Sequence, residues 1–197
     1  MSVSNKLPPA GSISLPATPA AAAPPPAMVQ VWDAPVRAFH WSLVGLFLVA
    51  YLSGEDAEGL HLFAGYCIVG LLALRVYWGF RGPLHARFSD FVKSPREVLD
   101  YMKLVRVHRA PRYLGHNPAG GAMAIALLLM IGCICFTGHL MTTTAWWGSE
   151  TMEDLHEFLV NATLGLIGLH LLGNFFSSHE NHENLTMSMV NGLKRRQ

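Results

Sequence analysis

Charged residues are scarce in this sequence. Only 14% of its 197 residues are charged, whereas 51% are hydrophobic, and a soluble domain carries about a quarter charged residues. The mean hydropathy is +0.31, which indicates a membrane protein. The net charge is only +1, and no basic cluster is interleaved with aromatic residues, so the sequence argues against nucleic-acid binding.

Cysteine is equally scarce. The three cysteines, Cys67, Cys133 and Cys135, all lie in apolar segments. No CxxC, CxxCH or cysteine–histidine finger spacing occurs, so neither structural disulfides nor covalent haem attachment is expected. These thiols are interpreted as small buried hydrophobic groups.

The first stretch of the sequence is a poor match to a secretory signal peptide. Residues 1–30 contain seven prolines and one charged residue, Lys6, without an apolar run behind a basic stretch. This composition predicts a disordered proline- and alanine-rich extension.

Four long apolar segments follow. They predict transmembrane helices at about residues 37–54, 60–80, 118–140 and 153–176. The expected fold is an all-α, integral membrane four-helix bundle with up-down-up-down topology, formed by residues 31–197. Residues 81–117 form a polar connector. Ser94 and Pro95 predict the start of an amphipathic surface helix in it, and the tail is predicted to be a short surface helix ending in three basic residues.

Lys and Arg are absent from the two short loops of the bundle. Residues 81–112 contain eight of them and the C-terminus three. By the positive-inside rule, both termini and the connector should face the cytoplasm.

Two histidines in the fourth apolar segment are spaced to leave the helix on one side. Fourteen residues separate His156 from His170, which corresponds to about 1400° of rotation and about 21 Å of rise. Ionisable groups at such depths are usually functional, although a single one is often only a hydrogen-bonded contact between helices. Depth in the membrane pairs His40 with His170, and His61 with His156.

Haem suits two opposed imidazoles in an apolar cavity, and ligation by two histidines leaves no iron position for a substrate. Six glycines would either admit a flat macrocycle or mediate close helix packing: Gly45, Gly65, Gly70, Gly132, Gly165 and Gly168. Arg75 would either contact a haem propionate or extend to the lipid headgroups. His139 would either bond a quinone or lie at the membrane interface.

Several stretches resemble the bacterial cytochrome b561 family, which is related to the cytochrome b subunits of nickel-iron hydrogenases. They are VWDAPVRAFHW, RVYWGFRGPLHARFSDFV, YLGHNPAGGAM, LHEFLVNATLGLIGLH and HENLTMSMVNGLKRR, and the resemblance covers about residues 30–196. It implies a multi-pass protein of the bacterial inner membrane with two non-covalent haem b groups. The axial iron ligands then match His40 and His170 on the cytoplasmic side, and His61 and His156 on the periplasmic side.

The resemblance implies transmembrane electron transfer. The main hypothesis is that the protein exchanges electrons between the quinone pool and a periplasmic redox partner such as a c-type cytochrome. The alternative is the cytochrome b membrane-anchor subunit of a nickel-iron hydrogenase. A histidine-based metal transporter is a hypothesis of another class, but no HExxH motif occurs and each layer offers only two histidines. Membrane lipid is an expected partner, while a homodimer and a role as a quinone-linked oxidoreductase subunit are left open.

Overall fold

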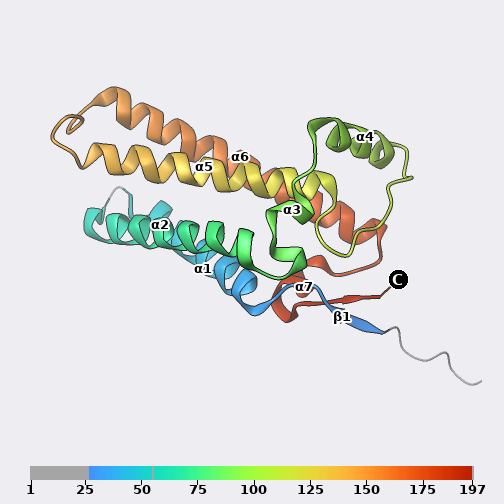
Figure 1. Cartoon of the computed structure of the whole chain (residues 1–197). Coiled ribbons are helices and arrows are strands. Elements are labelled where there is room, and N and C mark those ends of the chain that lie inside the picture. The colour runs from blue at the N-terminus through green and yellow to red at the C-terminus, as the bar shows by residue number, and fades with distance from the viewer. Residues whose placement is uncertain (1–26, 55, 197) are drawn as a thin grey trace, which may run out of the picture.

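The computed structural model describes residues 27–54 and 56–196, so residues 1–26 of the predicted extension lie outside it. Its elements follow one another along the chain (Figure 1) as β1 (Met28–Gln30), α1 (Ala34–Ser53), α2 (Glu58–Arg81), a 3-10 turn (Leu84–Ala86), α3 (Phe88–Phe91), α4 (Pro95–Arg106), α5 (Pro118–Met141), α6 (Glu150–Glu180), α7 (Leu185–Asn191) and β2 (Leu193–Arg195).

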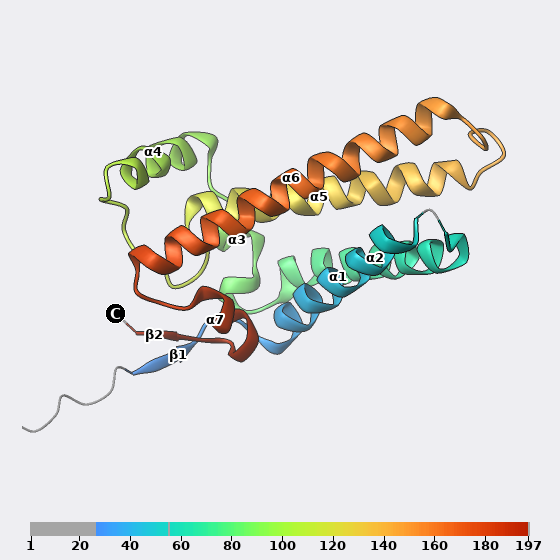
Figure 2. The same ribbon diagram turned by 180° about the vertical axis from the view of Figure 1, so that it is seen from behind.

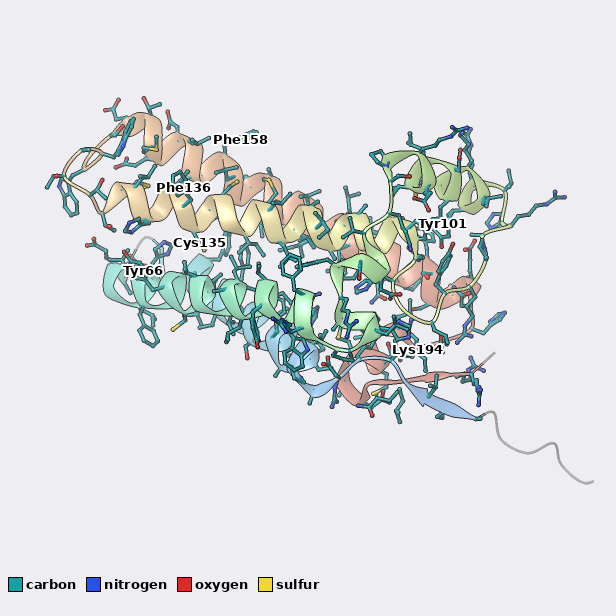
Figure 3. All side chains as sticks on the ribbon, viewed as in Figure 1. Tyr66, Tyr101, Cys135, Phe136, Phe158 and Lys194 are labelled. Atoms are coloured by element: carbon teal, nitrogen blue, oxygen red, sulfur yellow. The ribbon has the colours of Figure 1, made fainter. Side chains whose placement is uncertain are left out.

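Four of these helices, α1, α2, α5 and α6, are long and apolar enough to cross a membrane. They confirm the predicted all-α membrane bundle. Large apolar side chains lie on their outer surfaces. Phe136 and Phe158, for example, are 63% and 64% exposed and point away from the bundle (Figure 3), as side chains that contact lipid do. The helix α6 has 31 residues and is about 46 Å long, so it extends beyond a bilayer core of about 30 Å.

The bundle consists of two helical hairpins. The helices α1 and α2 pack along each other, as do α5 and α6, and the main contact between the hairpins joins α2 to α5. The first and last described elements, β1 and β2, lie with α3, α4 and α7 at one end of the bundle, called the termini end here. The short connections that follow α1 (residues 54 and 56–57) and α5 (residues 142–149) lie at the other, the loop end (Figures 1 and 2).

Side-chain caps fix where three of the helices begin. The Asp33 carboxylate accepts from the Val36 N–H at the start of α1, and the Asn117 side chain accepts from the Gly120 N–H at the start of α5. At α4, Ser94 forms a reciprocal capping box with its third following residue, which confirms the helix start predicted there. Such caps satisfy backbone donors that a helix leaves unpaired.

The termini end differs from the prediction in two places. Residues 28–30, expected in the extension, form β1, which pairs antiparallel with β2. The tail helix α7 ends at Asn191, so the basic residues Lys194 and Arg195 lie in a strand. Gly192 explains the change, because its left-handed conformation (φ 82°) ends the helix. Its carbonyl then accepts the N–H groups of Val31 and Trp32.

Two glycines allow α3 to pack between α2 and α5. A Cβ added to Gly121 would lie 2.3 Å from the carbonyl oxygen of Phe91, and one added to Gly79 would lie 2.2 Å from the ring of Phe88. The six glycines singled out in the sequence behave differently, because a Cβ on any of them would meet nothing within 4 Å. They therefore do not mediate tight helix contacts among the described residues.

His116 lies at the termini end, outside the spanning segments, between two aromatic rings. Its ring centroid is 4.7 Å from that of Trp32 and 4.8 Å from that of Phe91. Its Nδ1 atom is buried without a hydrogen-bond partner among the described residues. Burial, with smaller contributions from nearby positive or protonatable groups, lowers the pKa of His116 from 6.5 to about 3; these groups are Lys194, Arg75, His170 and His85.

This depressed pKa predicts acid sensitivity. The unfolded chain binds a proton at His116 near pH 6.5 and the folded chain only near pH 3. Stability should therefore be complete above pH 6.5 and fall on acidification, with a slope of up to about 1.4 kcal/mol per pH unit from this residue. Thermal unfolding in detergent between pH 7 and pH 4 measures the effect. The His116→Phe variant should show a shallower slope, and equal slopes would contradict the prediction.

Candidate functional site

A cavity lies between the two hairpins near the loop end. It has about 670 Å³ of empty volume, part of it open to the surroundings, and all four spanning helices line it. The lining is mainly apolar and includes Gly65 of α2, Ile131 of α5 and Val160 of α6. Tyr66 and Cys135 mark its position in Figure 3. Three histidines line it: His61, His139 and His156.

His61 of α2 and His156 of α6 face each other in this cavity. Their ring centroids are 6.2 Å apart and the ring planes are inclined by 68°. Each residue comes from a different hairpin, as expected for a group held inside a helical bundle. The structure thus brings together two histidines that depth alone had paired.

The tautomer of His61 follows from its hydrogen bond. Its Nδ1 atom lies 2.8 Å from the carbonyl oxygen of Ala50 in α1. A carbonyl oxygen only accepts, so Nδ1 must carry the proton and donate. The lone pair is then on Nε2, which is the usual arrangement of a histidine that binds a metal ion.

Thr137 of α5 orients His156 in the same way. Its Oγ1 atom lies 2.9 Å from Nδ1 of His156 and 3.0 Å from the carbonyl oxygens of both Cys133 and Ile134. The hydroxyl proton is directed to a carbonyl, so the oxygen accepts from Nδ1–H, and Nε2 of His156 is again free. The sequence interpretation had not included Thr137, although it is the only hydroxyl side chain between residues 118 and 141.

The second predicted pair, His40 of α1 and His170 of α6, lies toward the termini end. Both side chains are half-buried and lie within electrostatic range of each other. Nδ1 of His40 is buried without a hydrogen-bond partner among the described residues, so this ring has an unsatisfied nitrogen. Because α6 is continuous, its two histidines are about 21 Å apart along the axis.

Arg75 does not extend to the lipid headgroups. It is only 6% exposed, and its Nη1 donates to the carbonyl oxygen of Ala86 over 3.2 Å. Its guanidinium lies 5.1 Å from the ring centroid of Phe88 and 5.7 Å from that of Phe91. Contact with a haem propionate stays a prediction.

His139 lies at the rim of the cavity and is exposed. Its Nδ1 atom is 3.1 Å from the hydroxyl of Tyr66, and quinone contact stays a prediction. Within residues 27–54 and 56–196, no group of three or more His, Cys, Asp or Glu side chains could hold a metal ion.

The sequence profile described as prokaryotic cytochrome b561 matches residues 31–192. The chain belongs to this family. The chain is 34% identical to a probable Ni/Fe-hydrogenase B-type cytochrome subunit of Rhizobium leguminosarum bv. viciae, over 83% of this chain and 87% of the relative. It is 24% identical to a probable Ni/Fe-hydrogenase 1 B-type cytochrome subunit of Escherichia coli K12, over 83% and 89%. No solved structure matches.

As a member of this family, the protein is a multi-pass membrane cytochrome of the b type, and haem b is its cofactor. The loop-end cavity fits such a group. It is apolar, it lies between two hairpins, and the facing imidazoles of His61 and His156 both use Nδ1 in a hydrogen bond, which leaves Nε2 to bind iron.

Proposed function

We propose that this protein holds two haem b groups and serves as the membrane cytochrome b subunit of a Ni/Fe-hydrogenase-type complex. One haem would lie between His61 and His156 and the other between His40 and His170. The observation that carries the proposal is the loop-end pair, whose two rings face each other with their Nδ1 atoms fixed. The names of the relatives support a hydrogenase partner over a soluble c-type cytochrome.

The residues of the chain have three tasks in this proposal. When bound, haem b supplies a one-electron iron centre. The histidines would hold this group, while the Ala50 carbonyl and the Thr137 hydroxyl keep two of the rings in the tautomer that can bind iron. The apolar lining keeps water away. The helix α6 sets the spacing of the two levels across the membrane.

The orientation follows from charge. Lys and Arg are concentrated in the connector and the C-terminus, so the termini end would face the cytoplasm and the loop end the periplasm of a bacterial inner membrane. The loop-end pair would then lie nearest to a periplasmic hydrogenase. The haem between His40 and His170 would then exchange electrons with the quinone pool.

Copurification with a redox test checks this proposal. A hydrogenase should copurify with a tagged form of the protein that is isolated in mild detergent from its native organism. Hydrogen gas should then reduce the b haems of the isolated complex. The chain stripped of partners should be reduced by dithionite but not by hydrogen. A colourless protein would refute the haem assignment, and a c-type cytochrome in place of the hydrogenase would refute the partner.

The Thr137→Val substitution should weaken the loop-end site. Valine keeps the shape of the side chain but cannot accept from Nδ1–H of His156. Losing such an outer partner lowers metal affinity by about 10- to 100-fold. We expect one haem of the two to dissociate more readily and to change its midpoint potential, as measured by redox titration.

Thr163→Val is the matched control. Thr163 is also buried in a spanning helix, but its hydroxyl donates only to the Leu159 carbonyl of its own helix. Its removal should leave both midpoint potentials unchanged. An equal effect of the two substitutions would show that Thr137 has no special relation to His156.

A further inference from the structure

The helices that carry His40 and His170 lack an extensive interface with each other. The helix α1 packs along α2 and α6 packs along α5, and the pair α1–α6 is not among those with extensive contact. A group held between His40 and His170 therefore bridges two hairpins. Metal ligands must be held to within a fraction of an ångström to bind well, so another part of the chain has to set this separation.

The C-terminal segment lies where such a connection is needed. After α6 ends, the chain turns and runs through α7 and β2 past the start of α1 (Figures 1 and 2). On the α6 side, the Asn174 amide donates to the Thr186 hydroxyl over 3.0 Å, and the Leu185 N–H donates to the Ser178 hydroxyl over 3.3 Å. Asn174 follows His170 by one helical turn.

The same segment is bonded to the start of α1. Trp32 donates through its indole N–H to the Ser188 hydroxyl over 3.3 Å, and Trp41 donates to the Met189 carbonyl over 3.1 Å. Arg37 donates to a third acceptor, the Val190 carbonyl. Trp41 is next to His40 in the chain, and Arg37 precedes His40 by about one helical turn. The residues that bind the C-terminal segment therefore flank His40, the predicted haem ligand, in the sequence.

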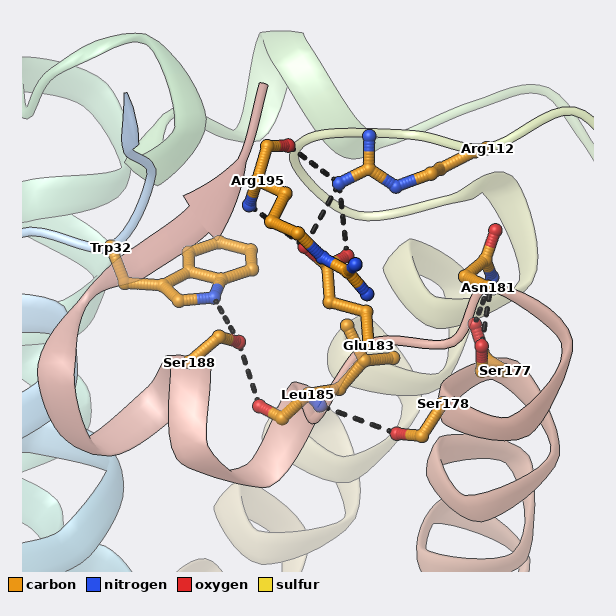
Figure 4. A network of polar contacts seen from close by, with 9 residues as sticks. All are labelled: Trp32, Arg112, Ser177, Ser178, Asn181, Glu183, Leu185, Ser188 and Arg195. Atoms are coloured by element: carbon orange, nitrogen blue, oxygen red, sulfur yellow. Dashed lines mark hydrogen bonds and ion pairs between the residues drawn. The ribbon is translucent and has the colours of Figure 1, made fainter. Parts of the chain in front are cut away.

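The end of β2 is also fixed to the connector. Both carboxylate oxygens of Glu183 accept from Arg112, and one of them also accepts the Arg195 N–H over 2.9 Å (Figure 4). Arg112 donates in turn to the Arg195 carbonyl over 2.7 Å. The guanidinium next to Glu183 helps to hold the pKa of that carboxyl below its usual value, against the effect of burial. This anchor therefore persists over the neutral pH range.

We infer that α7 and β2 act as a strut that sets the distance between His40 and His170. This inference rests on the proposed two-haem arrangement. The strut is attached at one end to Asn174 of α6, and at the other end to Trp32, just before α1, and to Trp41 of α1. Its residues are positioning residues. At the loop-end pair, the rings are instead oriented by the Ala50 carbonyl and the Thr137 side chain of the spanning helices themselves.

Gly192→Ala is the sharpest test. A Cβ at Gly192 would lie 2.5 Å from the carbonyl oxygen of Trp32, in a left-handed backbone conformation. The Gly148→Ala variant is a matched control, because Gly148 has φ 71° but a Cβ there would meet nothing within 4 Å. A deletion of residues 185–197 removes the strut. Ser188→Ala removes the acceptor for Trp32, together with the local hydrogen bond from the Ser188 hydroxyl to the Leu185 carbonyl.

The readouts are the haem-to-protein ratio and the low-spin ferric EPR spectrum, which responds to the angle between two axial imidazoles. Gly192→Ala and the deletion should change or remove the haem that His40→Ala removes, about half of the total for two sites. The haem that His61→Ala removes should be unaffected. Ser188→Ala should shift the EPR signal of the first haem alone, and Gly148→Ala should match the wild type.

Three results distinguish failure of the strut from failure of the proposed two-haem arrangement. Unchanged haem content and EPR spectra in both Gly192→Ala and the deletion would overturn the strut, as would an equal loss of both haems. The two-haem proposal is tested separately, on the wild-type protein. A haem-to-protein ratio of one or zero there would refute it. A spin-label distance between Ala38→Cys and Phe176→Cys, in a chain without its native cysteines, tests the strut without cofactor. Gly192→Ala should broaden the distribution of distances between the two spin labels.

Discussion

Replacing His156 with alanine is expected to remove about half of the haem from the purified protein and to leave the other half with its spectrum unchanged. His61→Ala is expected to remove the same haem, because the two rings face each other 6.2 Å apart in one cavity. His40→Ala and His170→Ala are expected to remove the other haem. A haem-to-protein ratio, combined with a redox titration of the reduced-minus-oxidised spectrum, identifies which haem each variant keeps.

His179→Ala provides the control for these substitutions. His179 is in the last turn of the same helix, exposed, and has no place in either pair, so both haems should remain. The double variant His61→Ala/His156→Ala should lose no more haem than either single variant. If His61→Ala and His156→Ala removed different haems, the pairing would be wrong.

Gly121→Ala is expected to destabilise the fold by about 1 to 3 kcal/mol, which is the usual effect of an extra methyl group in a well-packed region. The added methyl group would lie 2.3 Å from the carbonyl oxygen of Phe91. Backbone cannot rotate away as a flexible side chain can, and the Phe91 side chain is 1% exposed. The helix α3 must therefore move off α5. The temperature of unfolding in detergent, followed by circular dichroism, measures the loss.

Gly173→Ala is the corresponding control in α6. A methyl group at Gly173 would meet nothing within 4 Å, and alanine has the higher helix propensity. Its unfolding temperature should equal or exceed that of the wild type. If the two variants unfolded at the same temperature, the close packing of α3 against α5 would not contribute to stability.

The spanning helices could be predicted because their signals are local. Apolar length, the Ser94 and Pro95 start of α4 and the absence of Lys and Arg from two loops are all readable in short windows. The spacing of His156 and His170 also needs only the helical repeat. The pairing of β1 with β2 joins Val29 to Lys194, and no local pattern in three-residue strands predicts such a distant partner.

The surroundings of the histidines were less predictable. The Ala50 carbonyl that orients His61 is a backbone atom, and every residue has one. Arg75 had two interpretations, but its contacts with the Ala86 carbonyl and two phenylalanine rings depend on how the connector folds back. Likewise, the glycines that determine packing, Gly79 and Gly121, are distinguished from the others only by the position of α3.

Because the bundle consists of two hairpins, its assembly would depend on the supply of haem. Apolar surfaces of helices gain little from meeting each other in lipid, and the hairpins touch mainly through α2 and α5. In the proposed arrangement each haem joins one hairpin to the other, so its binding free energy is added to their association. A ligand at a thousand times its dissociation constant adds about 4 kcal/mol in this way. When haem is scarce, fewer molecules would then hold their two hairpins together.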